Sequence, residues 1–116
     1  MEDLLFRPAT ELRQLLTRGD ISARELTEAS IGRIEAVDPK INAIVTRSFD
    51  RALLAAEAAD GAFLAGADPG LLHGLPVAHK DLHDTAGIRT TYGSPIHADH
   101  VPTTSSLIVD RMWRAG

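Results

Sequence analysis

The sequence contains no cysteine and has little aromatic character, with one tryptophan, one tyrosine and three phenylalanines among 116 residues. Without cysteine there is no disulfide framework, no thiolate nucleophile and no cysteine-based metal site. No apolar run approaches the length of a transmembrane helix. The first residues lack the positive charge and long apolar stretch of a secretory signal. We therefore expect a cytoplasmic protein that does not bind membranes.

Basic clusters are also missing. Twelve lysines and arginines stand against sixteen aspartates and glutamates, which gives a net charge of −4. This balance argues against binding to nucleic acids. The content of 44% hydrophobic and 24% charged residues is typical of part or all of one soluble globular domain.

Helical signals dominate the first half of the chain. Leucines recur at helical spacing up to Gly19, which is expected to stop the first helix. Ser22 and Glu25 form a capping-box pattern at the start of a second helix, which ends before Pro39. The segment 48–65 is rich in alanine, which has high helix propensity, and this composition predicts a third helix. The expected helices cover residues 9–18, 22–38 and 48–65, with a last one capped by Thr104 or Ser105 and running through Met112.

Two short segments are predicted to be strands. Ile41–Thr46 is rich in β-branched residues, and Leu75–Ala78 is a short apolar run that follows Gly74. Strands that alternate with helices indicate an α/β layer structure. The second strand would carry Lys80 at its carboxyl end.

Lys80 is the candidate functional residue. With a strand period of two, Ala78, Lys80 and Leu82 share one face, and the carboxylate of Asp81 points to the other. A desolvated lysine without an acidic partner has a lowered pKa, which would make Lys80 a candidate base near neutral pH. For an arbitrary lysine, the simpler interpretation is a surface residue whose stem lies along the sheet.

The second half of the chain resembles the amidase signature family. The pieces that match in order and spacing are Gly74–Asp81, Thr85–Gly87, Thr90–Ser94, Ile108–Arg111 and Arg114–Gly116. The resemblance implies an α/β fold, namely the amino-terminal portion of an α/β/α sandwich with a mixed central sheet. Residues 1–116 would form part of an amidase domain, with leading helices over 9–66, the catalytic-lysine strand and loop over 74–103, and a helix over 104–115.

The family also implies a chemistry for Lys80. The lysine of this motif is the base end of a Ser–cis-Ser–Lys triad, and it transfers by position to Lys80. The two serines come from a glycine- and serine-rich segment that does not occur in these 116 residues. The implied parent enzyme is an amidase that hydrolyses a small-molecule carboxamide without a cofactor. The chain alone is expected to be inactive.

Other functions are open at this point. The amidase subunit of a tRNA-dependent amidotransferase shares the same motif. The sequence of residues 90–100, however, looks more like that of a stand-alone amidase. A non-catalytic α/β interaction module would account for the missing serines but not for the complete motif around Lys80. Oligomeric state is not indicated by the sequence.

Histidines and a serine pair suggest further sites, for which we expect structural roles. His79 and His83 are four residues apart, but the segment is predicted to be strand and loop, where that spacing does not serve a metal ion. We therefore expect no metal site. Ser105 and Ser106 are expected to cap a helix, because no glycine-rich turn accompanies them. Trp113 in the last helix is expected to be a packing residue.

Overall fold

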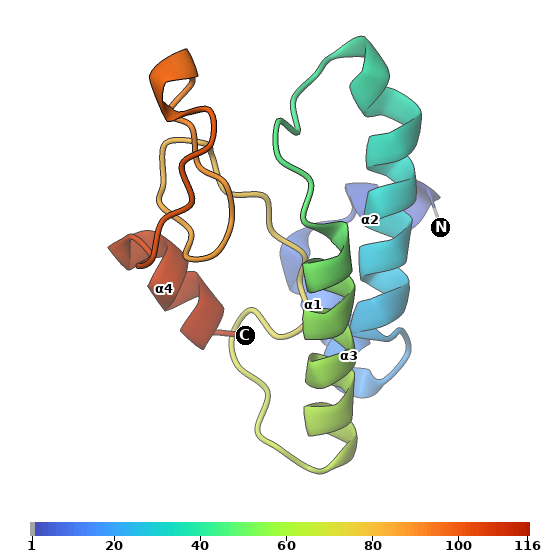
Figure 1. Ribbon diagram of the computed structural model, residues 1–116. Helices are drawn as coiled ribbons and strands as arrows, with labels where there is room; N and C mark the ends of the chain where they lie inside the picture. Colours follow the sequence, from blue (N-terminus) through green and yellow to red (C-terminus); the bar gives the residue numbers. More distant parts are fainter. Residues whose placement is uncertain (1) are drawn as a thin grey trace.

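Helices α2 and α3 form the centre of the fold. The computed structural model describes residues 2–116. In chain order its elements are the 3-10 helix η1 (Glu2–Phe6), α1 (Ala9–Arg18), α2 (Ala23–Val37), η2 (Asp38–Lys40), α3 (Phe49–Leu64), η3 (Pro95–His97) and α4 (Leu107–Arg114). Helix α2 packs against α3, and η1 also contacts α2 (Figure 1).

Local signals set the ends of the first helices, as the sequence predicts. Gly19 adopts a left-handed conformation at φ 76°, and its N–H donates to the Leu16 carbonyl of α1. The Asp20 N–H donates to Leu15, which satisfies a second carbonyl at this helix end. At the start of α2 the capping box between Ser22 and Glu25 is complete in both directions.

Asp60 of α3 joins α3 to the amino terminus of α2. Its carboxylate accepts hydrogen bonds from the amides of Ala23 at 2.7 Å and Arg24 at 3.0 Å. These amides belong to the first turn of α2, whose N–H groups have no partner within the helix. A negative charge at this position also interacts favourably with the helix dipole. The contact therefore fixes how the two central helices are placed relative to each other.

The core is small and lies among α1, α2 and α3. Its buried members are Leu16, Ala23, Leu26 and Ala56. Gly74 packs against this core next to Ala23 and has a backbone φ of 70°. A Cβ added at Gly74 would lie 2.9 Å from the Cβ of Ala23. The position thus needs glycine both for its backbone angle and for its close approach to α2.

The expected α/β fold class is wrong for this chain. The part of the chain that the structure describes is all-helical, with four α-helices and no strands. The nearest feature is one isolated antiparallel bridge between Thr85 and Ile88. A strand exists only when another segment pairs with its backbone groups, and residues 75–80 run without secondary structure and without such a pairing. The α/β/α sandwich with a mixed sheet is therefore not the architecture observed.

The expected strand at residues 41–46 is also absent, for a local reason. The buried carboxylate of Asp38 accepts hydrogen bonds from the amides of Ala43 at 2.6 Å and Ile44 at 3.1 Å. These bonds curl the chain and occupy N–H groups that a sheet would need. Burial would raise the pKa of Asp38, but these amides and the Arg47 guanidinium outweigh burial and lower the pKa.

The last helix begins later than the sequence suggests. Ser106 occupies the N-cap position of α4, not Thr104 or Ser105, and it makes no side-chain capping bond. The Ser105 hydroxyl instead accepts a hydrogen bond from the Ala86 amide at 3.0 Å. Ser105 thus holds the loop that follows Lys80 against the start of α4.

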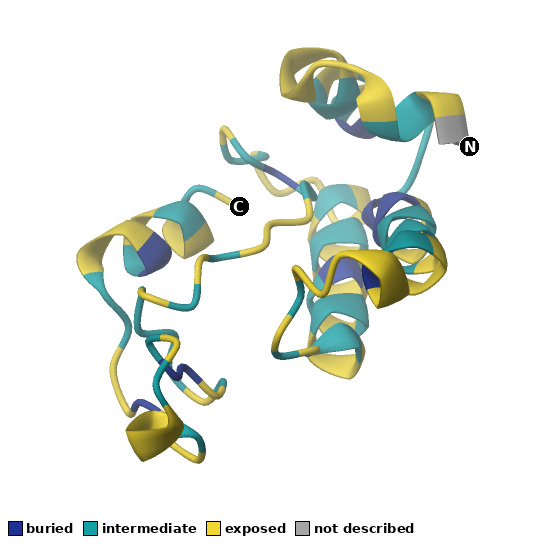
Figure 2. Cartoon of the chain, turned by 90° about the horizontal axis from the view of Figure 1, so that it is seen from above, coloured by how far each residue is buried: buried dark blue, intermediate teal, exposed yellow. Residues whose placement is uncertain are grey.

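Two groups of elements lie side by side. Figures 1 and 2 show α1–α3 on one side and the loops with α4 on the other. Residues 75–80, which we call the extended segment, run between them. Two arginines bridge the groups: Arg51 of α3 donates to the Ala86 carbonyl at 2.9 Å, and Arg89 donates to Thr46 at 3.2 Å. No helix within residues 2–116 is long and apolar enough to cross a membrane.

Candidate functional site: the loop that carries Lys80

Lys80 lies at the junction between the extended segment and the loop that follows it. Its carbonyl accepts a hydrogen bond from the His83 amide at 2.9 Å, so Lys80 is the first residue of a turn. The side chain is exposed, as are its neighbours Ala78 and Leu82. The expected burial on one face of a strand is therefore not found, because no segment within residues 2–116 covers Ala78, Lys80 and Leu82.

Asp81 binds a residue ten positions later. Its carboxylate accepts a hydrogen bond from the Thr91 amide at 2.8 Å and a second one from the Thr91 hydroxyl. The Asp81 carbonyl also accepts from the Tyr92 amide at 2.9 Å. The side-chain and backbone hydrogen bonds from Thr91 lower the pKa of Asp81, so the carboxylate is ionised at neutral pH. Asp81 therefore connects the start of this loop to Thr91 and Tyr92.

Tyr92 closes the same loop in an unusual conformation. It has a left-handed backbone at φ 54°, which is uncommon for a bulky residue. Its hydroxyl donates to the Asp84 carboxylate and lies 3.3 Å from the Nε2 atom of His100. The hydrogen bond to Asp84 raises the pKa of Tyr92. Tyr92 therefore stays a neutral donor over the physiological range.

Further backbone bonds make the loop a closed unit. Thr90 donates to the His100 carbonyl at 2.9 Å, and Gly87 donates to Pro102 at 2.9 Å. The amide of Ser106 donates to the Asp84 carbonyl at 2.9 Å, which connects the loop to α4. Thr90 and Thr91 are buried, whereas Lys80 remains at the surface. The loop thus has its own small polar interior.

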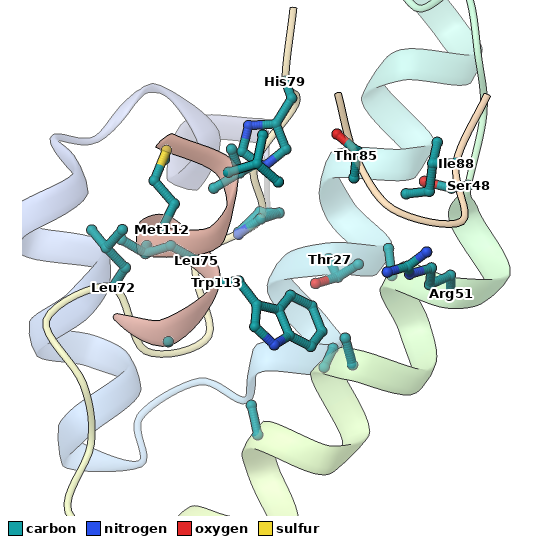
Figure 3. A pocket seen from close by; sticks show the side chains of 18 of the residues that line it. Thr27, Ser48, Arg51, Leu72, Leu75, His79, Thr85, Ile88, Met112 and Trp113 are labelled. Atoms are coloured by element: carbon teal, nitrogen blue, oxygen red, sulfur yellow. The ribbon is translucent and has the colours of Figure 1, made fainter. Parts of the chain in front are cut away.

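An apolar cleft of about 480 Å³ separates α3 from α4 and the extended segment. Alanines of α3 line one side, and Val77, His79, Met112 and Trp113 lie on the other. In Figure 3 the Trp113 side chain extends from α4 toward α3. The expected packing role of Trp113 is not seen within this chain, because the residue is 67% exposed. Lys80 does not line this cleft.

His79 lies at the cleft, next to Lys80. Burial lowers the pKa of His79, and the charge of His83 lowers it further. Both effects disfavour the imidazolium form, so His79 is neutral near pH 7. Residues 2–116 contain no group of three or more histidine, aspartate or glutamate side chains that could hold a metal ion.

The sequence alone indicates no role for Thr91 and Tyr92. Their contacts with Asp81 and Asp84 join residues that are ten and eight positions apart. An aspartate at the start of a loop does indicate side-chain bonding to nearby backbone. It does not reveal which later residue supplies the donor.

Comparison with known protein families identifies the chain's relationship. The family model described as Amidase matches residues 25–116. The chain belongs to the amidase family. The matched range includes Lys80, its loop and α4, in agreement with the motifs in the second half of the sequence.

Curated relatives show the same relationship over nearly the whole chain. The A subunit of the glutamyl-tRNA(Gln) amidotransferase of Moorella thermoacetica is 44% identical over 114 residues, which is 98% of this chain and 23% of the relative. The corresponding protein of Geobacter metallireducens is 47% identical over 106 residues, which is 91% of this chain and 22% of the relative. The chain therefore spans less than a quarter of the length of these relatives.

Solved structures share the arrangement of these helices and loops. A chain from a vestigial protein complex, described as revealing the evolutionary origins of an s-triazine catabolic enzyme, matches with a TM-score of 0.90 at 32% identity. A bacterial aryl acylamidase of the amidase signature family matches with a TM-score of 0.87 at 29% identity. Each match covers 95% of this chain, and 24% and 23% of the respective structure.

Proposed function

We propose that this chain is the lysine-bearing portion of an amidase of the type found as the A subunit of a glutamyl-tRNA(Gln) amidotransferase. The observation that carries the proposal is the identity of 40–47% to such subunits over 91–100% of this chain. The sequence of residues 90–100 suggests a stand-alone amidase, but the identity to amidotransferase A subunits outweighs that indication. Residues 1–116 would then be one part of a larger amidase domain.

Lys80 is the residue to which we assign the chemistry. In the reaction that the family implies, a serine attacks the amide carbonyl while a second serine passes its proton toward Lys80. Lys80 then returns a proton to the departing ammonia, and water releases the acid. Both serines must come from polypeptide other than these 116 residues. The position of Lys80 at the surface supports the assignment, because its amine is open to groups from such polypeptide.

A stand-alone amidase is the second candidate. The match to the aryl acylamidase at a TM-score of 0.87 favours it, since that protein is named for amide hydrolysis alone. Under this alternative Lys80 has the same role, but the substrate differs and the leaving amine or ammonia is released to solvent instead of being passed to an acceptor.

Replacement of Lys80 tests the assignment in the complete product of the reading frame that encodes these residues. Lys80→Ala should lower kcat/KM by several orders of magnitude while the thermal melt stays nearly unchanged. Lys80→Arg should be almost as damaging, because a guanidinium stays protonated and cannot accept the proton of the serine. Lys80→Arg with most of the activity retained would show that Lys80 acts only as a fixed charge.

A pair of assays separates the two candidates. Release of the arylamine from a simple acylated arylamine measures hydrolysis, and formation of amidated glutamyl-tRNA(Gln) with added partner subunits measures transfer. An amidotransferase component should support transfer and hydrolyse the acylated arylamine poorly. The opposite result would favour the stand-alone amidase.

A further inference from the structure

The lysine side chain has little to hold it in place. Within residues 2–116, no carboxylate forms an ion pair with the Lys80 ammonium and no hydrogen bond fixes it. A lysine stem has four flexible carbons and loses considerable rotamer entropy when it is ordered. The position of the amine therefore depends strongly on how rigidly the Lys80 backbone is fixed.

The backbone of Lys80 is fixed from the side of Asp81. Three hydrogen bonds run from Thr91 and Tyr92 to Asp81: two to its carboxylate and one to its carbonyl. The Thr91 hydroxyl that donates to Asp81 also accepts from the Gly93 amide at 3.2 Å. Thr91 is buried and Asp81 is partly buried, so this set of bonds is partly shielded from water. We call these residues, Asp81 and Thr91, the clamp.

The conformation of Tyr92 is an independent sign that this part of the loop is rigid. A tyrosine at φ 54° persists only when its surroundings hold it there. Its amide is bound by Asp81 and its hydroxyl by Asp84, so both ends of the residue are fixed. The loop therefore maintains a costly backbone angle next to the clamp, directly beside the candidate base.

From these contacts we infer that Asp81 and Thr91 are positioning residues that hold Lys80 for proton transfer. The inference rests on the proposed function of Lys80. It assigns the clamp a role in catalysis beyond holding the loop folded. A misplacement of a catalytic group by about 1 Å can cost about 100-fold in rate, so loss of the clamp should act mainly on kcat.

Three variants of the complete reading-frame product test the inference. Thr91→Val removes the hydroxyl of the clamp and keeps the shape of the side chain. Thr91→Ser keeps the hydroxyl and is the conservative rescue. Thr90→Val is the matched control, because Thr90 is also buried and its hydroxyl donates to the Ile88 carbonyl at 3.1 Å without touching Asp81.

The expected result is a split between kcat and KM. Thr91→Val should lower kcat by about 10- to 100-fold with KM changed less than about threefold, and Thr91→Ser should restore most of kcat. Thr90→Val should lower the melting temperature by a similar amount but leave kcat near that of the unsubstituted protein. If Thr91→Val does not fold, Asp81→Asn takes its place, since it keeps the volume and one acceptor oxygen.

Two outcomes would overturn the inference, and they differ from failure of the proposed function. Equal kcat values for Thr91→Val and Thr90→Val would reduce the clamp to a purely structural role. A loss that Thr91→Ser does not rescue would do the same. If Lys80→Ala itself retains activity, the proposed function fails, and the inference about the clamp fails with it.

Discussion

A few single residues determine the path of the loops, either by packing closely against a helix or by binding backbone amides with a charged side chain. Gly74 lies against the first turn of α2, where a side chain does not fit. The carboxylates of Asp81 and Asp38 each accept hydrogen bonds from amides of a later segment. These hydrogen bonds keep the pKa of both residues below the ordinary value for aspartate. These positions decide the path of the loops, because loop backbone has no regular ladder to satisfy its polar groups.

Gly74→Ala should destabilise the protein by about 1–3 kcal/mol or more. The added Cβ would lie 2.9 Å from the Cβ of Ala23, and φ 70° is unfavourable for alanine. Gly61→Ala is the control, because Gly61 is inside α3 with nothing within 4 Å of the added atom. It should stabilise the helix by about 0.5–1 kcal/mol. Urea unfolding measures both, and equal effects of the two substitutions would contradict the steric argument.

Asp81 should make stability depend on pH in the acid range. A carboxylate whose folded pKa is lowered contributes stability above its ordinary pKa of about 3.9, and this stability is lost as the pH falls through the folded value. Asp81→Asn cannot ionise. The difference in melting temperature between the two proteins should therefore be largest above about pH 4 and shrink toward pH 2. A difference that stays constant from pH 7 to pH 2 would rule out this linkage.

At the scale of elements, the first three helices form where the sequence predicts them, α4 begins later than predicted, and the two predicted strands are absent. The bounds of α1 agree with the predicted range 9–18, and α2 and α3 agree within two residues at each end. Capping, propensity and periodicity act between residues a few positions apart, so they can be recognised in the sequence. Residues 41–46 and 75–78 have strand composition, but no neighbouring segment pairs with them.

Asp60→Ala should cost about 1.5–3 kcal/mol, since the Asp60 carboxylate binds two amides at the start of α2. Asp60→Asn should lose less, because it keeps one acceptor oxygen. Glu57→Ala is a matched control on the same helix: its ion pair with Arg24 is exposed and should contribute about 1 kcal/mol or less. Thermal melts of the three variants give the order, and Glu57→Ala as the most damaging change would contradict the assignment.

The whole molecule buries little and exposes much apolar surface. Among residues 3–116, whose burial the structure describes, the buried apolar core is confined to α1–α3, apart from Val109 of α4, whereas thirteen large hydrophobic residues are exposed. Two of these, Val77 and Trp113, line the cleft between α3 and α4. A patch of this kind on a small protein is typical of a surface that contacts other polypeptide.

The fluorescence of Trp113 measures whether the cleft is exposed to solvent. Trp113 is the single tryptophan and is 67% exposed, so its fluorescence in the 116-residue chain should be red-shifted and strongly quenched by acrylamide. In the complete product of the reading frame, any further polypeptide over the cleft should shift the emission to the blue. A blue-shifted, unquenched signal from the 116-residue chain would show that it covers the cleft by itself or by self-association.

The 116-residue chain by itself should hydrolyse no amide. Each of its serines lies at a helix start, in a helix or in a loop, and Lys80 without serine partners cannot form an acyl-enzyme. Release of ammonia from aliphatic and aromatic amides measures this, with a heat-treated sample as the control. Time-dependent release above that control would overturn the prediction.

The sequence by itself determined the family, the helices and the choice of Lys80 as candidate. The motif around Lys80 agrees with the match to the amidase family over residues 25–116. These features depend on residue identity and on spacing within a few residues, which a single sequence carries in full. The catalytic role of Lys80 stays a prediction, because the structure does not test it.

Only the tertiary structure decided the fold class and the surroundings of Lys80. It showed that residues 75–80 are extended but unpaired, that Lys80 is exposed, and that Asp81 binds Thr91. Whether an extended segment becomes a strand, and which later residue meets an aspartate, depends on contacts between positions far apart along the chain. Such contacts follow from how the whole chain packs, so local pattern could not give them.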